Sequence, residues 1–237
     1  MYKKKDFLAI IPARAGSKRI PNKNLQVIGN TPLIEFTIKS AQSSICLSNI
    51  IISSNDKKVI RLAKKLGLEV PFVRPIRLST DNASTSSVIF HAVKWFKKKH
   101  KNLPKNIILL QPTSPFRTAT DINKSINQFA KSRKKTLVSV CIPFQNPNDF
   151  LIKSKNGKYK RLKIIKTRNS KYEQKNSEIF FIDGGIYITT TEQFLKTKDI
   201  IGSDPELFVT KQSHAIDIDT PFDLDLARAV YNNNSQK

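Results

Sequence analysis

The stretch FLAIIPARAGSKRIPNKNL, residues 7–25, joins an apolar run to a loop that is rich in positive charge. Residues 7–11 are continuously apolar rather than alternating, which is typical of a strand buried on both faces of a parallel sheet. In the loop after Pro12, Gly16 and Ser17 allow backbone N–H groups to point inward, and there are four cations: Arg14, Lys18, Arg19 and Lys23. Cations and free N–H groups together suit a polyphosphate. The stretch therefore predicts a buried first strand followed by an anion-binding loop.

Apolar runs and amphipathic segments alternate along the chain. The runs that predict buried strands after the first are 50–53, 107–111 and 137–141, and the fold resumes at 184–190. The segments with helical spacing are 31–43, 55–67, 84–99 and 118–132. This alternation predicts an α/β, Rossmann-like fold, with a mostly parallel sheet and helices on both faces. The length of 237 residues suits a single domain, 1–237.

Residues 144–180 interrupt this pattern. They are polar and rich in lysine, and Asn156-Gly157 within them is a favoured hairpin turn. The segment lacks the apolar run of a buried strand. Two interpretations stay open: an inserted arm that pairs with another subunit, or a flexible loop.

The charge of the chain is strongly positive. Lys and Arg number 42 against 18 Asp and Glu, which gives a formal net charge of +24. Such an excess raises the question of nucleic-acid binding. The lysines are scattered in short runs, however, as on a generic solvated surface, so we expect no specific nucleic-acid partner.

Composition also bears on the compartment. No apolar run approaches the roughly 18–20 residues that span a bilayer, so we expect no membrane partner. The apolar stretch after the basic N-terminus is too short for a signal peptide, which favours a cytoplasmic protein. Cys46 and Cys141 lie far apart without CxxC spacing and fit a reduced compartment. The histidines show no metal-ligand spacing: His91, His100 and His214.

Ligands of an open α/β sheet lie beyond the carboxyl ends of the strands, which is where the first loop is placed. This loop matches neither the P-loop nor the GxGxxG pattern. A second motif, LLQPTSPFR at 109–117, ends another strand and holds Gln111 at the same edge, with one acceptor and two donors. The alternative for Gln111 is a loop side chain that bonds nearby backbone. For Arg117, contact with substrate anions and a surface ion pair are equally open.

Two aspartates near the C-terminus form a candidate metal site. In AIDIDT, residues 215–220, a strand would place Asp217 and Asp219 on one face, about 7 Å apart. Carboxylates together with phosphate oxygens are the ligands that Mg²⁺ prefers. The alternative is a pair of ordinary polar-face aspartates. The sequence TPFD at 220–223 is typical of a helix N-terminus, so Asp223 is expected to be structural.

Six motifs follow one another over nearly the whole chain: IIPARAGSKRIPNKNL, SSNDKKVIRLAKKLG, VRPIRLSTDNAST, LLQPTSPFR, GGIYI and IDIDTPFDLDLA. In this order they resemble the sialic acid cytidylyltransferase family, the CMP-N-acylneuraminate synthetases. The resemblance implies a nucleotidyltransferase fold over 1–237. It also implies transfer of CMP from CTP to a nonulosonic sugar acid with release of pyrophosphate, a Mg²⁺ cofactor, and a homodimer built through the 144–180 arm.

The resemblance further implies roles for individual residues. Arg14 and Lys23 would contact the phosphates of CTP, and Gln111 would contact the sugar. The implied substrate contacts are Ser17, Lys18, Asn24, Arg74, Ser84 and Gln111. The implied catalytic residues are Arg14, Lys23, Asp217 and Asp219, of which the two aspartates would hold magnesium.

Three acidic residues depart from the family pattern in the sugar-binding half. Asp149, Glu173 and Asp183 stand near positions where the family offers a lysine, an arginine and an asparagine. Because a carboxylate close to the substrate carboxylate repels it, we expect poor use of N-acetylneuraminate and better use of a related acid such as legionaminic acid. Asp183 is the residue expected to contact the sugar, and lysines within 153–166 are an alternative source of positive charge.

Other functions stay open beside this one. Within the enzyme class, the alternatives are cytidylyltransferases for pseudaminic acid or for 3-deoxy-manno-octulosonic acid. In a different class, the chain would be a catalytically inactive protein that binds nucleotide or RNA through its positive charge. A nucleic-acid binder is distinguished by a steep loss of affinity with added salt.

Overall fold

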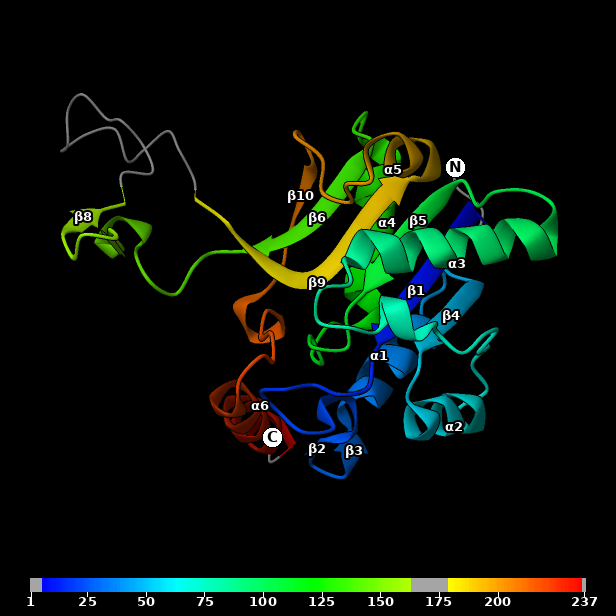
Figure 1. The fold of residues 1–237 in the computed structure, drawn as a ribbon, viewed down its shortest axis with the longest axis horizontal. Coiled ribbons are helices and arrows are strands. Elements are labelled where there is room, and N and C mark those ends of the chain that lie inside the picture. Colours follow the sequence, from blue (N-terminus) through cyan, green and yellow to red (C-terminus); the bar gives the residue numbers. More distant parts are fainter. Residues whose placement is uncertain (1–5, 163–178, 236–237) are drawn as a thin grey trace.

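The computed structural model describes residues 6–162 and 179–235 and is built around a six-stranded sheet in the order β10-β6-β9-β5-β1-β4 (Figure 1). The strands are β1 (Phe7–Ala13), β4 (Asn49–Ser54), β5 (Asn106–Leu110), β6 (Thr136–Cys141), β9 (Phe181–Thr190) and β10 (Glu206–Val209). β1 pairs in parallel with β4 and β5, and β10 pairs in parallel with β6. β9 runs antiparallel between β5 and β6, so the sheet is mixed.

Helices cover both faces of this sheet. On β1, Phe7, Ala9 and Ile11 face one apolar cluster, and Leu8 and Ile10 face the other. The first cluster includes side chains of α1 (Leu33–Gln42), α2 (Lys57–Lys65) and α4 (Ala119–Lys131), and the second includes those of α3 (Thr85–His100) and α5 (Thr191–Thr197). Because neither face of the strand meets water, both need apolar side chains. The predicted three-layer α/β architecture is confirmed, and the four predicted helices lie within two residues of α1, α2, α3 and α4.

A third apolar cluster fastens the two ends of the chain together. It contains Ile20 from the first loop, Ile218 from the segment before the last helix, and Leu33 at the start of α1. The last helix is α6 (Pro221–Ser235), and the first loop includes η2 (Lys23–Leu25), β2 (Val27–Ile28) and β3 (Thr31–Pro32). Burial of these side chains holds residues of the first loop beside residues about two hundred positions later.

The 144–180 segment leaves the sheet after β6. Its described part contains η4 (Pro147–Asp149) and a hairpin of β7 (Leu151–Lys153) and β8 (Tyr159–Arg161). Gly157 has φ +81°, as the predicted Asn-Gly turn requires. Figure 1 shows this arm extending away from the body of the sheet, whereas residues 163–178 lie outside the described part of the chain. Over the described residues, no helix is long and apolar enough to cross a membrane.

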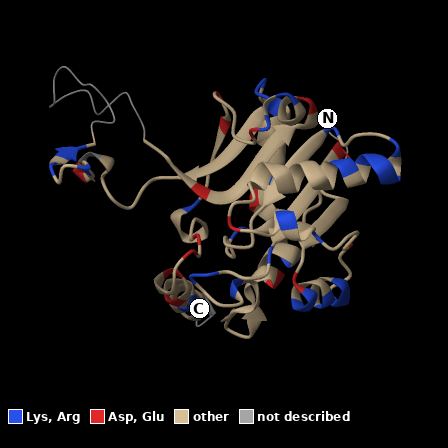
Figure 2. Cartoon of the chain, viewed as in Figure 1, with Lys and Arg blue, Asp and Glu red and all other residues tan. Residues whose placement is uncertain are grey.

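The positive charge is distributed rather than gathered into one stripe. Figure 2 shows Lys and Arg on α2, on the end of α3, near α5 and on the arm. On α2 alone, five cations lie on the exposed side: Lys57, Lys58, Arg61, Lys64 and Lys65. This distribution agrees with the predicted generic solvated surface.

Candidate active site

A cavity of about 530 Å³ opens at the carboxyl ends of β1 and β5. Its walls are the first loop, the turn before α3, the residues after β5 and the segment before α6. The lining residues are Pro12, Arg14, Ser17, Lys18, Arg19, Ile20, Lys23, Asn24, Arg74, Leu78, Thr80, Asp81, Ala83, Thr85, Val88, Gln111, Pro112, Thr113, Asp217 and Asp219. The cavity lies at the edge where the sequence placed the ligand, because the parallel strands β1 and β5 end there.

The first loop is held by hydrogen bonds between its backbone and two asparagine side chains. Gly16 has φ +76°, which a residue with a side chain rarely adopts. The N–H of Ala15 donates to Asn55 Oδ1 at 2.9 Å, and Asn24 Nδ2 donates to the carbonyl of Arg14 at 3.2 Å. Asn24 is buried, so its amide braces the loop from within while the residue borders the cavity.

Two cations of this loop share one carboxylate. Arg14 Nη2 lies 2.6 Å from Asp81 Oδ1, and Lys18 Nζ lies 2.6 Å from Asp81 Oδ2. Asp81 belongs to the turn between η3 (Ile76–Leu78) and α3. The hydrogen bonds from Lys18 and then Arg14 lower the pKa of this carboxyl. Asp81 is a site residue that the sequence reasoning missed, since no spacing connects it with a loop 67 residues earlier.

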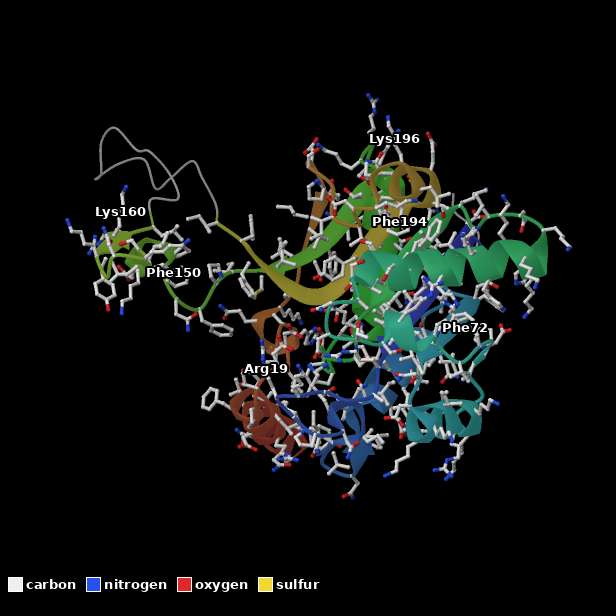
Figure 3. All side chains as sticks on the ribbon, in the orientation of Figure 1. Arg19, Phe72, Phe150, Lys160, Phe194 and Lys196 are labelled. Atoms are coloured by element: carbon white, nitrogen blue, oxygen red, sulfur yellow. The ribbon has the colours of Figure 1, made fainter. Side chains whose placement is uncertain are left out.

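The other two cations face the end of the chain. Lys23 Nζ donates to Asp219 Oδ1 at 3.0 Å and to the carbonyl of Ile218 at 2.9 Å. Arg19, which Figure 3 labels beside the start of α6, lies 3.6 Å from Asp219 Oδ2. Lys23 and Asp219, two of the residues implied to be catalytic, are therefore in direct contact.

Arg74 is the buried cation of the cavity. Its side chain is 4% exposed, and its Nε and Nη2 groups have no hydrogen-bond partner among the described residues. Burial, and next the charge of Arg14, lower the pKa of Arg74 to about 10, so the guanidinium stays protonated at neutral pH. A buried guanidinium with free N–H groups at a cavity wall lacks the acceptors that such groups normally have, and a bound anion would supply them.

The two aspartates border the cavity on a segment that is not a strand. Residues 215–219 are irregular, so the predicted strand is wrong. The two aspartates still face the cavity while Ile218 between them is fully buried. The N–H of Ile218 donates to the carbonyl of Thr113 at 2.9 Å. Burial raises the pKa of Asp217, and its Oδ1 has no partner among the residues described. Asp223 caps α6, accepting from the N–H groups of Asp219 and Thr220 at 3.0 and 2.7 Å, as predicted.

Gln111 stands directly after β5 and borders the cavity, as expected. Opposite it, Gly184 has φ +75°, and a Cβ at this position would lie 3.2 Å from Gln111 Oε1 and 3.3 Å from Asp217 Oδ2. A residue other than glycine would therefore be strained by this φ and would require the neighbouring side chains to shift slightly.

The expected position of Asp183 is corrected by the structure. The side chain is buried within the sheet, and its carboxylate accepts hydrogen bonds from Ser139 Oγ, from Thr210 Oγ1 and, at 2.9 Å, from the N–H of Gly185. These partners lie where the register of β6 and β9 shifts between Val138 and Val140. Three donors compensate the buried charge, so Asp183 holds the irregularity of β9 instead of facing the cavity.

Neither expectation for Arg117 is met. Its side chain is 2% exposed, and it donates to the carbonyls of Gln111 and Gly185 at 3.1 and 2.7 Å and to Thr37 Oγ1 at 2.8 Å. Burial lowers the pKa of Arg117 to about 10, although Asp183 and Asp121 oppose this effect. Arg117 is therefore an internal brace for the strand ends that carry Gln111 and Gly184.

The remaining predicted residues divide between the cavity and its surroundings. Ser17 borders the cavity, whereas Ser84 caps α3 by accepting from the N–H of Ser87 at 3.2 Å. Ser84 is not among the residues that line the cavity, although the residues on either side of it, Ala83 and Thr85, are. Asp149 lies exposed in η4 on the arm, and Glu173 is outside the described residues.

Comparisons with known proteins agree with this geometry. A family model described as cytidylyltransferase matches residues 8–234. The CMP-N,N'-diacetyllegionaminic acid synthase of Legionella pneumophila is 31% identical over 231 residues, which cover 97% of this chain and 98% of the relative. The pseudaminic acid cytidylyltransferase of Campylobacter jejuni is 30% identical over 232 residues, covering 97% of each chain.

A solved structure shows the same fold. The CMP:2-keto-3-deoxy-manno-octonic acid synthetase complexed with CTP matches with a TM-score of 0.68 at 17% identity, over 96% of this chain and 99% of that chain. The two relatives cover nearly the whole sequence, and the family model spans every residue that borders the cavity. The chain therefore belongs to the CMP-nonulosonic acid cytidylyltransferase family, whose members are nucleotidyltransferase enzymes.

Proposed function

We propose that the chain transfers CMP from CTP to a nonulosonic sugar acid and releases pyrophosphate. The observation that carries this proposal is one cavity that gathers the four cations of the first loop, the buried Arg74 and three carboxylates. The names of the relatives supply the substrate class, since they act on diacetyllegionaminic acid and pseudaminic acid. Two anionic reactants can share a site only where positive charge neutralises them.

In the proposed reaction, the anomeric hydroxyl of the sugar acid attacks the α-phosphorus of CTP. A new oxygen–phosphorus bond forms while the hydroxyl loses its proton to water, the bond to the β-phosphate oxygen breaks, and pyrophosphate leaves with the electron pair. We propose that Arg14 and Lys23 neutralise the charge on the phosphates, and that Arg74 donates through N–H groups that have no partner among the described residues. Gln111 stands at the same edge and is proposed to orient the sugar.

We also propose a magnesium ion as cofactor, held by Asp217 and Asp219. The unpartnered Oδ1 of Asp217 is a buried oxygen that a cation would satisfy, and Asp219 borders the same cavity. Over the described residues, no group of three or more His, Cys, Asp or Glu forms a complete metal cage. Two carboxylates suit an ion that also takes phosphate oxygens and water, and such an ion would neutralise charge that develops on the phosphates.

The buried position of Asp183 removes this residue from the argument about which sugar acid is the substrate. Because its carboxylate is buried and bonded to Ser139 and Thr210, it gives no reason for discrimination at the sugar site. Asp149 is exposed on the arm and does not border the cavity, and Glu173 lies outside the described residues, so the expected poor use of N-acetylneuraminate stays a prediction from the sequence. We therefore propose a legionaminic-type or pseudaminic-type acid as the substrate, in line with the relatives.

A screen of pyrophosphate release tests the function. We expect release with CTP and at least one acid among legionaminic, pseudaminic, N-acetylneuraminic and 3-deoxy-manno-octulosonic acids, and strong preference for CTP over ATP and GTP. A pocket that hydrogen-bonds one base leaves polar groups unpaired with another. Equal release with ATP would contradict the proposal. No release with any acid, together with RNA binding that weakens steeply with salt, would favour the inactive nucleic-acid binder.

We further propose that the protein is a homodimer whose subunits pair through the 144–180 arm of a single domain. Figure 3 shows Phe150 and Lys160 on the arm, away from the sheet. The large apolar side chains exposed on the described arm and at its base are Ile142, Phe144, Phe150, Leu151, Ile152, Tyr159, Phe181 and Ile182. So many exposed apolar residues in one region are typical of a surface that is covered by a partner.

Light scattering at micromolar concentration tests this assembly. We expect a dimer for the native protein and a shift toward monomer for Leu151→Asp, since a charge would be buried at the interface. The matched control is Ile45→Asp, which changes an exposed apolar residue between α1 and β4, away from the arm. A fully active native monomer would count against the proposal.

A further inference from the structure

Asp81 engages both oxygens of its carboxylate with cations of the first loop. Arg14 Nη2 donates to Oδ1 and Lys18 Nζ to Oδ2, each at 2.6 Å. All three residues border the cavity. The carboxylate thus lies in the position that a phosphate oxygen would take between the same two donors.

The exposure of these groups makes their ion pairs easy to exchange. The side chain of Lys18 is 79% exposed and that of Asp81 is 38% exposed. Ion pairs between exposed groups contribute little free energy, because water competes for both partners. The pair of Lys23 and Asp219 differs, because Lys23 is 17% exposed and also bonds the carbonyl of Ile218. Asp219 also meets two loop cations, but its contact with Arg19 is long, at 3.6 Å. In the Asp81 bridge, both carboxylate oxygens lie 2.6 Å from a loop cation.

The shape of the loop does not depend on Asp81. Ala15 is bonded to Asn55, the carbonyl of Arg14 is bonded to Asn24, and Ile20 is buried in the third apolar cluster. These contacts fix the backbone before and after Lys18. Removal of the Asp81 charge would therefore free two cationic side chains without releasing the chain that carries them.

Resting on the proposed function, we propose that Asp81 is a displaceable counter-ion that holds Arg14 and Lys18 between turnovers and yields them to the phosphates of the nucleotide. With Asp81, the three groups carry a net charge of +1, and without it +2. A carboxylate next to the phosphate site repels bound phosphate, so Asp81 weakens the binding of both CTP and pyrophosphate. Weaker binding of the product favours its release, and tight binding of the ground state would not speed the chemical step.

The test is titration calorimetry of CTP and of pyrophosphate, each without sugar acid, on the native protein and on Asp81→Asn and Asp81→Ser. We expect both variants to bind both ligands about fivefold more tightly, as two weak ion pairs no longer compete. The constant for inhibition by pyrophosphate should fall by a similar factor. The matched control is Asp204→Asn, which removes an exposed carboxylate paired with Lys134 outside the cavity and should leave both affinities unchanged.

The direction of the change separates the possible roles. Weaker or unchanged binding in both Asp81 variants, with native circular dichroism, would overturn the inference and make Asp81 a residue that merely orients the cations. Equal tightening in Asp204→Asn would also overturn it, because overall charge would then explain the effect. Absence of CTP and pyrophosphate binding to the native protein would instead overturn the proposed function, on which the inference rests.

Discussion

Replacement of Asp217 by asparagine is expected to lower turnover about 100-fold or more. The carboxylate borders the cavity, its Oδ1 has no partner within residues 6–162 and 179–235, and it lies on the same segment as Asp219. Loss of one group that stabilises developing charge in a closed site costs about 10²–10³ in turnover. The amide is similar in size but neutral, so it cannot neutralise a cation. Asp219→Asn is expected to show a loss of the same order.

Steady-state pyrophosphate release at saturating CTP and at several Mg²⁺ concentrations measures this effect. Folding should persist in both variants, because Asp219 is exposed and Asp217 is not part of an apolar cluster. The control is Asp225→Asn, which removes an equal charge from exposed α6, where Asp225 pairs with Arg228. If both site variants kept near-native rates at limiting Mg²⁺, the assignment of these aspartates to a metal would be wrong.

Arg117→Met is expected to lower the free energy of unfolding by about 3–5 kcal/mol, the cost of breaking a buried charged network. The substitution fills much of the same space but leaves the carbonyls of Gln111 and Gly185 without their donor. Buried acceptors that lose their partner retain the full cost of desolvation. Arg117→Lys should recover only part of the loss, since one ammonium cannot reproduce the planar fork of the guanidinium.

Urea unfolding, analysed by linear extrapolation, measures this difference. Arg61→Met is the matched control, since Arg61 is exposed on α2 and its loss should change the free energy of unfolding by at most about 0.5 kcal/mol. A loss below about 1 kcal/mol for Arg117→Met would show that the buried guanidinium does not brace the strand ends.

Local patterns were enough to predict the α/β architecture. The apolar runs identified β1, β4, β5 and β6, and the helical spacings identified α1 to α4, because each of these elements buries its own apolar face. The antiparallel direction of β9 was not predicted, since a buried run has the same composition in either direction. The order of the strands in the sheet became known only from the hydrogen-bonded pairing in the structure.

The candidate site was predicted in part. The first loop, Gln111 and the two aspartates meet at one cavity, because strand ends and the buried Ile218 place them there. Arg117 and Asp183 were expected near solvent or substrate and are buried instead. Their polarity suggested exposure, but hydrogen bonds from Ser139 and Thr210 and to buried carbonyls compensate their charges within the sheet.

The sequence by itself determined which charged groups the chain can offer to a ligand, because the loop cations lie within residues 14–23 and the paired aspartates within 217–219. Only the tertiary structure decided which of these charges meet. Asp81 reaches Arg14 and Lys18 across 67 and 63 positions because the turn before α3 is folded against the end of β1. Electrostatic energy depends on the distance between charges in space, and separation along the chain does not specify that distance.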